Sequence, residues 1–186
     1  ARTIQLDLPP FTLIAATTRI AMLSSPLRSR FSGGVFRLEF YTNDEIKEIA
    51  RRSLGILGAD LTLEDDALDE IAMRSRFTPR TANYLLKRVR DFAQVRKEPF
   101  SKKTVGAALA LLGIDELGLS QSDRKTLEVI IDKFNGGPVG LKTVAAATSE
   151  EEATIEEVIE PYLIQLGLLD RTAKGRVATK KAYDHL

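Results

Sequence analysis

The chain has 186 residues, 44% of them hydrophobic, which is enough for one large or two small cores. It contains no cysteine and a single histidine, His185, so disulfides and thiolate metal sites are excluded and a histidine-based catalytic or metal centre is disfavoured. No stretch approaches the roughly 18 apolar residues of a membrane span, and no signal peptide is evident, so we expect a soluble, cytoplasmic protein.

The net charge of +1 conceals an uneven distribution of charge along the chain. Residues 74–103 contain ten basic and two acidic side chains, residues 150–160 contain six glutamates and no base, and residues 171–181 are again basic. Such blocks favour subunit interfaces and a local phosphate contact over a uniformly basic DNA-coating surface. Ordinary solvated faces are the alternative interpretation.

Residues 1–41 have the pattern of the edge of an α/β domain. Alternation over Ile4–Leu8 predicts a half-buried strand, and the apolar run Phe11–Ala16 predicts a strand covered on both faces of a parallel sheet. Because no second βα unit follows, we expect the rest of this sheet to lie outside the sequence. Residues Thr17–Arg19 follow this strand, at the edge where α/β proteins bind ligands, but threonine as a turn former explains them equally well.

Residues 42–112 predict four amphipathic helices that form a small bundle. The signals that start these helices are, in order, Thr42–Glu45, Thr62–Asp65, Thr78-Pro79 and Ser101. The first matches the capping box, in which a hydroxyl and a carboxylate each satisfy a backbone N–H. The third places proline at the first helical position, where its missing N–H costs nothing.

Residues 113–186 predict a winged helix, a relative of the helix-turn-helix. The first of these residues, Gly113–Ser120, are expected to form a linker. The expected elements are helices at Ser122–Phe134, Leu141–Thr148 and Thr154–Leu166, the last capped from Thr154 through Glu157, and strands at Leu168–Thr172 and Gly175–Thr179. The two strands form a ribbon, the wing, around a short turn.

A complete catalytic site cannot be assembled from this sequence. It has no Gly-x-x-x-x-Gly-Lys-Ser/Thr loop for phosphates, no acidic pair after an apolar strand for Mg²⁺, and no Ser/His/Asp or Cys/His set. Arg28 and Arg30 stand two apart after Pro26, an arrangement that suits a guanidinium held out for a phosphate. An ordinary exposed arginine is the alternative.

Together these motifs resemble the RuvB family of AAA+ motors, which drive branch migration of Holliday junctions. Residues 16–41 resemble the sensor-1 and arginine-finger stretch of that family, residues 78–93 its sensor-2 lid helix, and residues 136–179 its winged-helix head. The resemblance covers nearly the whole chain in order. It implies a mostly α fold in three parts: the C-terminal edge of a large α/β ATPase domain (1–41), a four-helix lid (42–112) and a winged-helix head (113–186).

The resemblance also implies roles around ATP. One of Thr17 and Thr18, with Thr18 favoured, would be the sensor that faces the γ-phosphate. Arg30 would be the finger inserted into a neighbouring subunit's ATP site, where it offsets transition-state charge and makes hydrolysis depend on assembly. Tyr41 would border the nucleotide, and Arg80 would be the sensor-2 arginine that touches phosphate in its own subunit.

For DNA, the resemblance implies phosphate contacts by Arg171 and Arg176 of the wing. The charges support this independently, and add Lys174. Three glutamates between positions 156 and 160, expected on the outer face of the third helix, would be repelled by phosphates and disfavour base reading by that helix. Backbone contact without base readout suits a motor that must move along any sequence.

The implied cofactors are ATP or ADP with Mg²⁺, and the implied assembly is a hexameric ring on Holliday-junction DNA. RuvA, the junction-binding partner, would grip a hairpin that precedes this segment, and RuvC would join the larger complex. The full protein would be an ATP-dependent four-way-junction helicase, and these residues alone, without the phosphate loop, would be inactive.

The sequence departs from the family pattern at several places. The loop Phe31–Phe36 is one residue longer than usual, and Phe77 stands where the family usually has glycine. Two other classes also remain: a winged-helix transcription regulator with a helical dimerisation domain, and a clamp-loader-like AAA+ subunit whose C-terminal domain is a helical collar without a wing.

Overall fold

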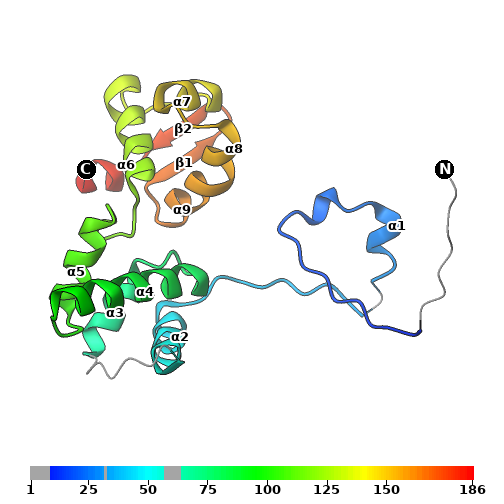
Figure 1. Ribbon diagram of the computed structural model, residues 1–186. Coiled ribbons are helices and arrows are strands. Elements are labelled where there is room, and N and C mark those ends of the chain that lie inside the picture. Colours follow the sequence, from blue (N-terminus) through cyan, green and yellow to red (C-terminus); the bar gives the residue numbers. More distant parts are fainter. Residues whose placement is uncertain (1–8, 32, 57–63) are drawn as a thin grey trace, which may run out of the picture. The chain divides into compact units, whose positions relative to one another are not determined.

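The computed structural model describes residues 9–31, 33–56 and 64–186 (Figure 1). The strand predicted at Ile4–Leu8 and the helix start predicted at Thr62 therefore lie outside the described residues. The chain divides into two compact units, one up to Glu39 and one from Phe40 onward, and each is described by itself. Within the described residues, no helix is both long and apolar enough to cross a membrane.

The described part of the first unit contains little regular structure. A 3-10 turn, η1 (Ile20–Met22), precedes a single-turn helix, α1 (Ser25–Arg28). The strand predicted at Phe11–Ala16 is wrong, because this segment has no strand structure and its side chains are exposed. A strand needs a neighbour to satisfy its backbone N–H and C=O groups, and the described residues supply none.

Four helices form the first part of the second unit, as predicted. They are α2 (Asn43–Ile56), α3 (Asp65–Met73), α4 (Pro79–Arg96) and α5 (Lys102–Leu111), and we call them the lid. The capping box before α2 is confirmed: the Thr42 N–H donates to the Glu45 carboxylate at 2.8 Å, and the Glu45 N–H donates to the Thr42 hydroxyl at 3.3 Å. The Ser101 hydroxyl likewise caps α5.

Apolar side chains from all four lid helices meet in one buried core. Ile46, Ile71, Leu85 and Leu109, one from each helix, are fully buried in it. Their i, i+3 and i+4 neighbours continue the same faces, as the sequence periodicity predicts. The lid is therefore a bundle with its own hydrophobic core.

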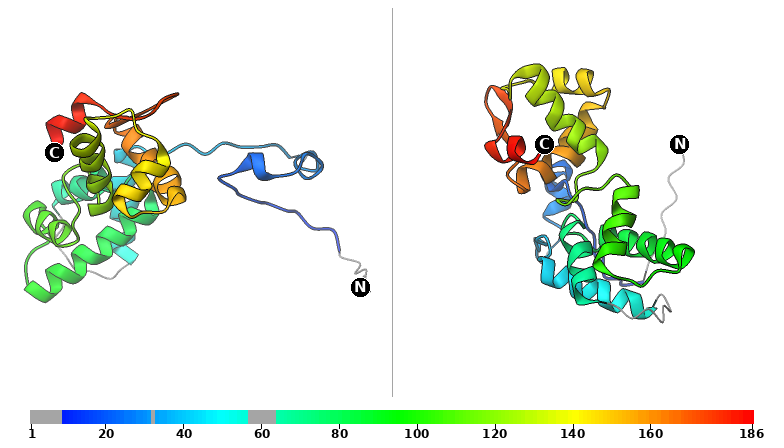
Figure 2. Two further views of the ribbon diagram at one scale, coloured as in Figure 1. Left: turned by 90° about the horizontal axis from the view of Figure 1, so that it is seen from above. Right: turned by 90° about the vertical axis from the view of Figure 1, so that its left-hand side faces the viewer.

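The rest of the second unit is a winged helix, which we call the head (Figures 1 and 2). Its elements are α6 (Gln121–Glu128), η2 (Val129–Lys133), α7 (Leu141–Thr148), α8 (Glu152–Thr154), η3 (Ile155–Ile159), α9 (Glu160–Gln165), β1 (Leu169–Thr172), β2 (Gly175–Ala178) and α10 (Lys180–His185). The strands β1 and β2 pair antiparallel, and a bridge from Val139 to Arg176 adds a third backbone segment. A second buried core fills this domain.

The third helical run of the head differs from its prediction. It begins at Glu152, two residues earlier than expected, and Thr154 has helical backbone angles, so the capping box predicted from Thr154 is wrong. The run passes through the π-helical turn η3 just before Pro161. Proline offers no N–H and crowds the carbonyl four residues back, so a wider turn here lets the helix continue. The C-terminal helix α10 was not predicted.

Candidate functional site

The basic side chains of the wing differ in their exposure to solvent. Lys174 lies exposed in the turn between β1 and β2, and the described residues offer it no ion-pair partner. Arg171, on β1, is also exposed, but its Nη2 atom lies 2.7 Å from Glu156 Oε1. The side chains of Arg171 and Glu156 are each about half exposed. A phosphate could therefore replace Glu156 as the partner of Arg171 without any change in the core.

Arg176, in contrast, is buried. Its Nε atom lies 2.5 Å from Glu160 Oε1, and its Nη2 atom donates to Glu160 Oε2 at 3.2 Å. Glu160 is only 1% exposed, so the expectation that it lies on the outer face of the helix is wrong. The π turn η3, which ends just before Glu160, makes the helical faces differ from those of a regular α-helix. This geometry counts against a direct phosphate contact by Arg176.

The two wing arginines belong to one network. Arg171 and Arg176 are direct cross-strand partners, and like charges in that position repel. Glu160 offsets the repulsion, because its carboxylate binds Arg176 and also lies 3.9 Å from Arg171 Nη1. Glu156 neutralises Arg171 from the solvent side. The wing is thus fixed to the third helix by carboxylates, while Lys174 stays open to solvent.

The residues expected to sense ATP lie in both units. In the first unit, the Thr17 hydroxyl accepts a hydrogen bond from the Arg19 N–H at 3.0 Å and so closes its own turn. Arg30 follows α1 and is exposed, with no ion-pair partner among the residues described. In the second unit, Tyr41 is 44% exposed just before α2. Thr17 and Arg30 thus belong to one unit, and Tyr41 belongs to the other.

Arg80 occupies the second position of α4 and is exposed. No ion pair to it occurs within residues 9–31, 33–56 and 64–186. A guanidinium that is exposed and unpaired at a helix N-terminus, where backbone N–H groups also point outward, suits a phosphate ligand. Arg80 has both features, whereas Arg30 shares the exposure but follows the C-terminal end of α1. The described residues contain no group of three acidic or histidine side chains that could hold a metal ion.

Sequence reasoning missed a polar cluster where the lid contacts the head. The Arg76 guanidinium forms an ion pair with the buried Asp123 and lies over the Tyr162 ring, 4.7 Å from its centroid. The Tyr162 hydroxyl donates to the Leu117 carbonyl at 2.6 Å. Burial raises the pKa of Tyr162 to about 12, although the positive charge of Arg76 acts in the opposite direction. Phe77, singled out as an unusual residue, was the one available signal.

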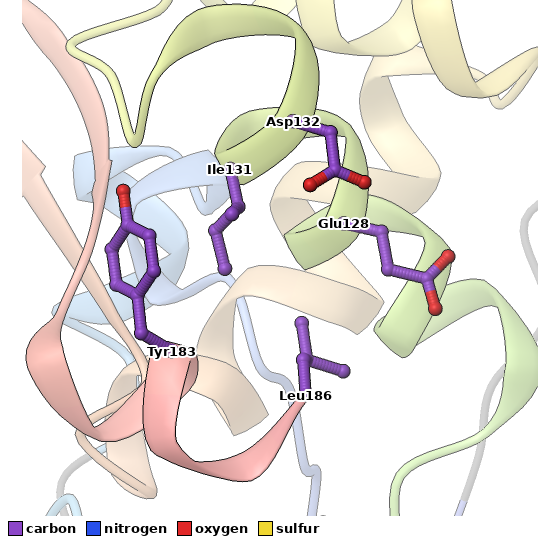
Figure 3. A pocket seen from close by; sticks show the side chains of 5 residues that line it. All are labelled: Glu128, Ile131, Asp132, Tyr183 and Leu186. Carbon is purple, nitrogen blue, oxygen red and sulfur yellow. The ribbon is translucent and has the colours of Figure 1, made fainter.

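A pocket in the head has a different character (Figure 3). Glu128, Ile131 and Asp132 line it from α6 and η2, and Tyr183 and Leu186 line it from the C-terminal end of the chain. None of these side chains is basic, so the pocket is unsuited to a phosphate ligand. The candidate sites for nucleotide and DNA are the wing and the exposed arginines.

The second unit is thus a four-helix bundle followed by a winged helix, an order of domains that fits the lid and the C-terminal domain of an AAA+ protein. Family models match the chain in three consecutive parts: the Holliday junction DNA helicase RuvB P-loop domain over residues 1–38, the RuvB AAA lid domain over 41–115 and the RuvB C-terminal winged helix domain over 116–186. The chain belongs to the RuvB family.

Curated relatives support this assignment. Over its whole length the chain is 58% identical to the Holliday junction branch migration complex subunit RuvB of Oleidesulfovibrio alaskensis and 56% identical to that of Dehalococcoides mccartyi. It covers 57% and 53% of these proteins, so it spans little more than half of their length.

Solved structures agree. The RuvB Holliday junction branch migration motor of Thermotoga maritima matches with a TM-score of 0.85 and 50% identity, over 95% of this chain and 58% of that one. A point mutant of the Thermotoga RuvB matches with a TM-score of 0.86 and 49% identity, over 96% and 59%. The wing itself contradicts the clamp-loader-like alternative, which predicted a helical collar.

Proposed function

We propose that these residues form the finger, lid and DNA-contacting head of an ATP-dependent hexameric motor that drives branch migration of Holliday junctions in recombination and repair. The observation that carries the proposal is the succession of three RuvB family models over residues 1–38, 41–115 and 116–186. The relatives are named as subunits of a branch migration complex. In such a complex RuvA and RuvC are the expected protein partners, and the cytoplasm is the expected location.

In this motor, Arg30 completes the ATP site of a neighbouring subunit and Arg80 contacts phosphate within its own subunit. Both guanidinium groups are exposed and have no ion-pair partner in the described part of the chain, which supports both roles. One of Thr17 and Thr18 is the sensor, with Thr18 favoured; the Thr17 hydroxyl accepts the Arg19 N–H within its own turn but keeps its O–H for donation. Tyr41 borders the nucleotide at the start of the lid. ATP with Mg²⁺ supplies the phosphoryl group that is transferred to water.

At the DNA, Lys174 and Arg171 contact backbone phosphates, and Arg176 supports them from beneath. Lys174 is exposed and has no ion-pair partner among the residues that the structure describes, and Arg171 exchanges Glu156 for a phosphate. Arg176 keeps the wing attached to α9 through Glu160. Contacts of this kind fix the protein on the duplex without reading bases, as a motor that passes over every sequence requires.

The binding of a fluorescent four-way junction to this chain, followed by anisotropy over a series of salt concentrations, tests the wing. We expect the double variant Arg171→Ala/Lys174→Ala to weaken binding at least tenfold and to lower the slope of log K against log salt by about 1–2, since each lost phosphate contact removes about 0.9. Lys87→Ala, which removes one exposed charge from α4, is the control and should change neither.

Unchanged affinity and unchanged salt slope in the double variant would contradict a DNA-contacting wing. The same assay separates the remaining alternative, a winged-helix transcription regulator. That class predicts strong preference for one duplex sequence, whereas a branch-migration motor binds junctions of unrelated sequence with similar affinity.

A further inference from the structure

The segment between α3 and α4 lies against the head. It comprises residues 74–78 and ends at the N-cap of α4, two positions before Arg80. Gly118 packs so closely on Arg74 that an added Cβ would lie 2.9 Å from the Arg74 carbonyl oxygen and 2.9 Å from the Tyr162 hydroxyl. Only glycine fits between these groups, which indicates a close and specific contact between the two domains.

Two consecutive residues of this segment have left-handed backbone angles. Arg76 and Phe77 both have φ of 55°, a region that favours glycine and strains a residue with a bulky side chain. Both side chains contact the head: Arg76 pairs with Asp123, and the Phe77 ring lies 6.3 Å from the Tyr162 ring. These contacts hold Arg76 and Phe77 in a strained backbone conformation, and so they set the direction in which α4 begins.

The anchoring groups are themselves fixed within the head. Asp123 is fully buried, and its Oδ2 atom accepts the Ser120 N–H at 2.7 Å and the Ser120 hydroxyl at 2.6 Å, which caps α6. Tyr162 is 5% exposed and its hydroxyl is bound to the Leu117 carbonyl. Neither side chain can follow a movement of the lid without losing its own partners.

The hydrophobic cores of lid and head are separate, so the relative orientation of the two domains depends on the contacts between them. Phe77, which lies between two lid helices, packs against the core of the head. The linker carries a further connection, in which Arg124 donates to the carbonyl of Gly113 at 2.9 Å. The Arg76–Phe77 turn is therefore the place where the start of α4 is tied to the head.

We infer that Asp123 and Tyr162 are positioning residues for the sensor arginine: acting through Arg76 and Phe77, they fix the first turn of α4, and with it Arg80, to the head. The role of Arg80 at phosphate rests on the proposed function. The contact of Arg76 and Phe77 with the head does not depend on that role. Through this contact, a tilt of α4 is coupled to a movement of the head and its wing.

Spin labels test the tie directly. The chain has no cysteine, so Asn83→Cys on α4 and Lys142→Cys on α7 provide two exposed and unique labelling sites. Double electron–electron resonance then measures the distribution of distances between them. We expect one narrow distribution in the otherwise unchanged chain, and a distribution at least twice as wide in the variant Arg76→Met/Phe77→Gly.

Glycine adopts a φ of 55° without strain, so Phe77→Gly removes the ring contact while preserving the turn. If circular dichroism shows that the double variant loses helical content, Phe77→Gly alone is used for the test. Its distance distribution should also be wider than that of the parent. Arg88→Met is the matched control, since Arg88 lies over Tyr84 of its own helix, and it should leave the distribution narrow. Arg76→Lys keeps the positive charge, so its distance distribution should be narrower than that of Arg76→Met.

A distribution in Phe77→Gly and in the double variant as narrow as in the parent would overturn the inference, and so would a parent distribution already as wide as that of the variants. Junction binding is measured on the same proteins. Its loss in Arg171→Ala/Lys174→Ala concerns the proposed function, whereas Arg76→Met/Phe77→Gly should retain the parent Kd for junction DNA. The two proposals can therefore fail independently.

Discussion

Replacing Arg176 with methionine removes the partner of a buried carboxylate. Glu160 is 1% exposed, and its two oxygens are bound by Arg176, while Arg171 lies 3.9 Å away and is half exposed. Breaking such a pair from one side typically costs about 3–5 kcal/mol, because the remaining charge loses its partner without regaining water. Methionine keeps much of the apolar stem, so the loss of packing is small.

Urea unfolding followed by circular dichroism measures the change in the free energy of unfolding. Hydrogen exchange of peptides from the head and the lid shows where the change occurs. We expect Arg176→Met to lower the stability of the head by about 3 kcal/mol or more, a factor of over 100 in its folded-to-unfolded ratio, while lid peptides are unaffected. Arg171→Met breaks an exposed pair and should cost at most about 1 kcal/mol.

Removing the charges of both Arg176 and Glu160 tests whether the unpaired carboxylate causes the loss of stability. Arg176→Met/Glu160→Leu should recover much of the stability lost in Arg176→Met, since no buried charge is left unpaired. The reasoning would be refuted if Arg176→Met were as stable as the parent but lost more affinity for junction DNA than Arg171→Ala. That result would identify Arg176 as a phosphate ligand.

Further predictions concern pH and capping. Because the pKa of Tyr162 is raised to about 12 from 10.0, the stability it contributes is complete below pH 10 and is lost as the pH rises from 10 toward 12; Tyr162→Phe should reduce this loss in alkaline melting curves. Lys47 and Arg51 lower the pKa of Asp65, so its contribution is present above pH 3.8 and disappears as the pH falls further, and Asp65→Asn should flatten the acid melting curve of the lid. Thr42→Ala removes the cap of α2 and should cost about 1 kcal/mol in urea unfolding, whereas an unchanged midpoint would contradict a stabilising cap.

Local signals predicted the helices well. The lid helices follow from apolar periodicity and from caps such as Thr42 and Ser101, because helical hydrogen bonds join residues close in sequence. The boundaries of α7 match the predicted Leu141–Thr148. The wing strands follow from short β-rich segments around a turn, and they differ from the prediction only at their ends.

Contacts between distant residues could not be predicted in this way. Arg76 meets Asp123, 47 residues later, and Arg176 meets Glu160, which lies just after a π turn in the third helix of the head. A charge pattern cannot distinguish a buried arginine from an exposed one, so Arg171 and Arg176 looked equivalent. The apolar run Phe11–Ala16 predicted a buried strand, but its side chains are exposed, because a strand also depends on partners that the described residues do not provide.

The motor function is tested most directly by joining residues 1–186 to the nucleotide-binding half of a relative, such as the subunit from Oleidesulfovibrio alaskensis, and measuring ATP hydrolysis and migration of a synthetic junction. We predict that the chimera hydrolyses ATP and moves the junction, that Arg30→Ala abolishes hydrolysis, and that Arg171→Ala/Lys174→Ala preserves DNA-independent hydrolysis while slowing migration. A chimera that binds nucleotide but never moves a junction, or one whose hydrolysis survives Arg30→Ala unchanged, would contradict this function.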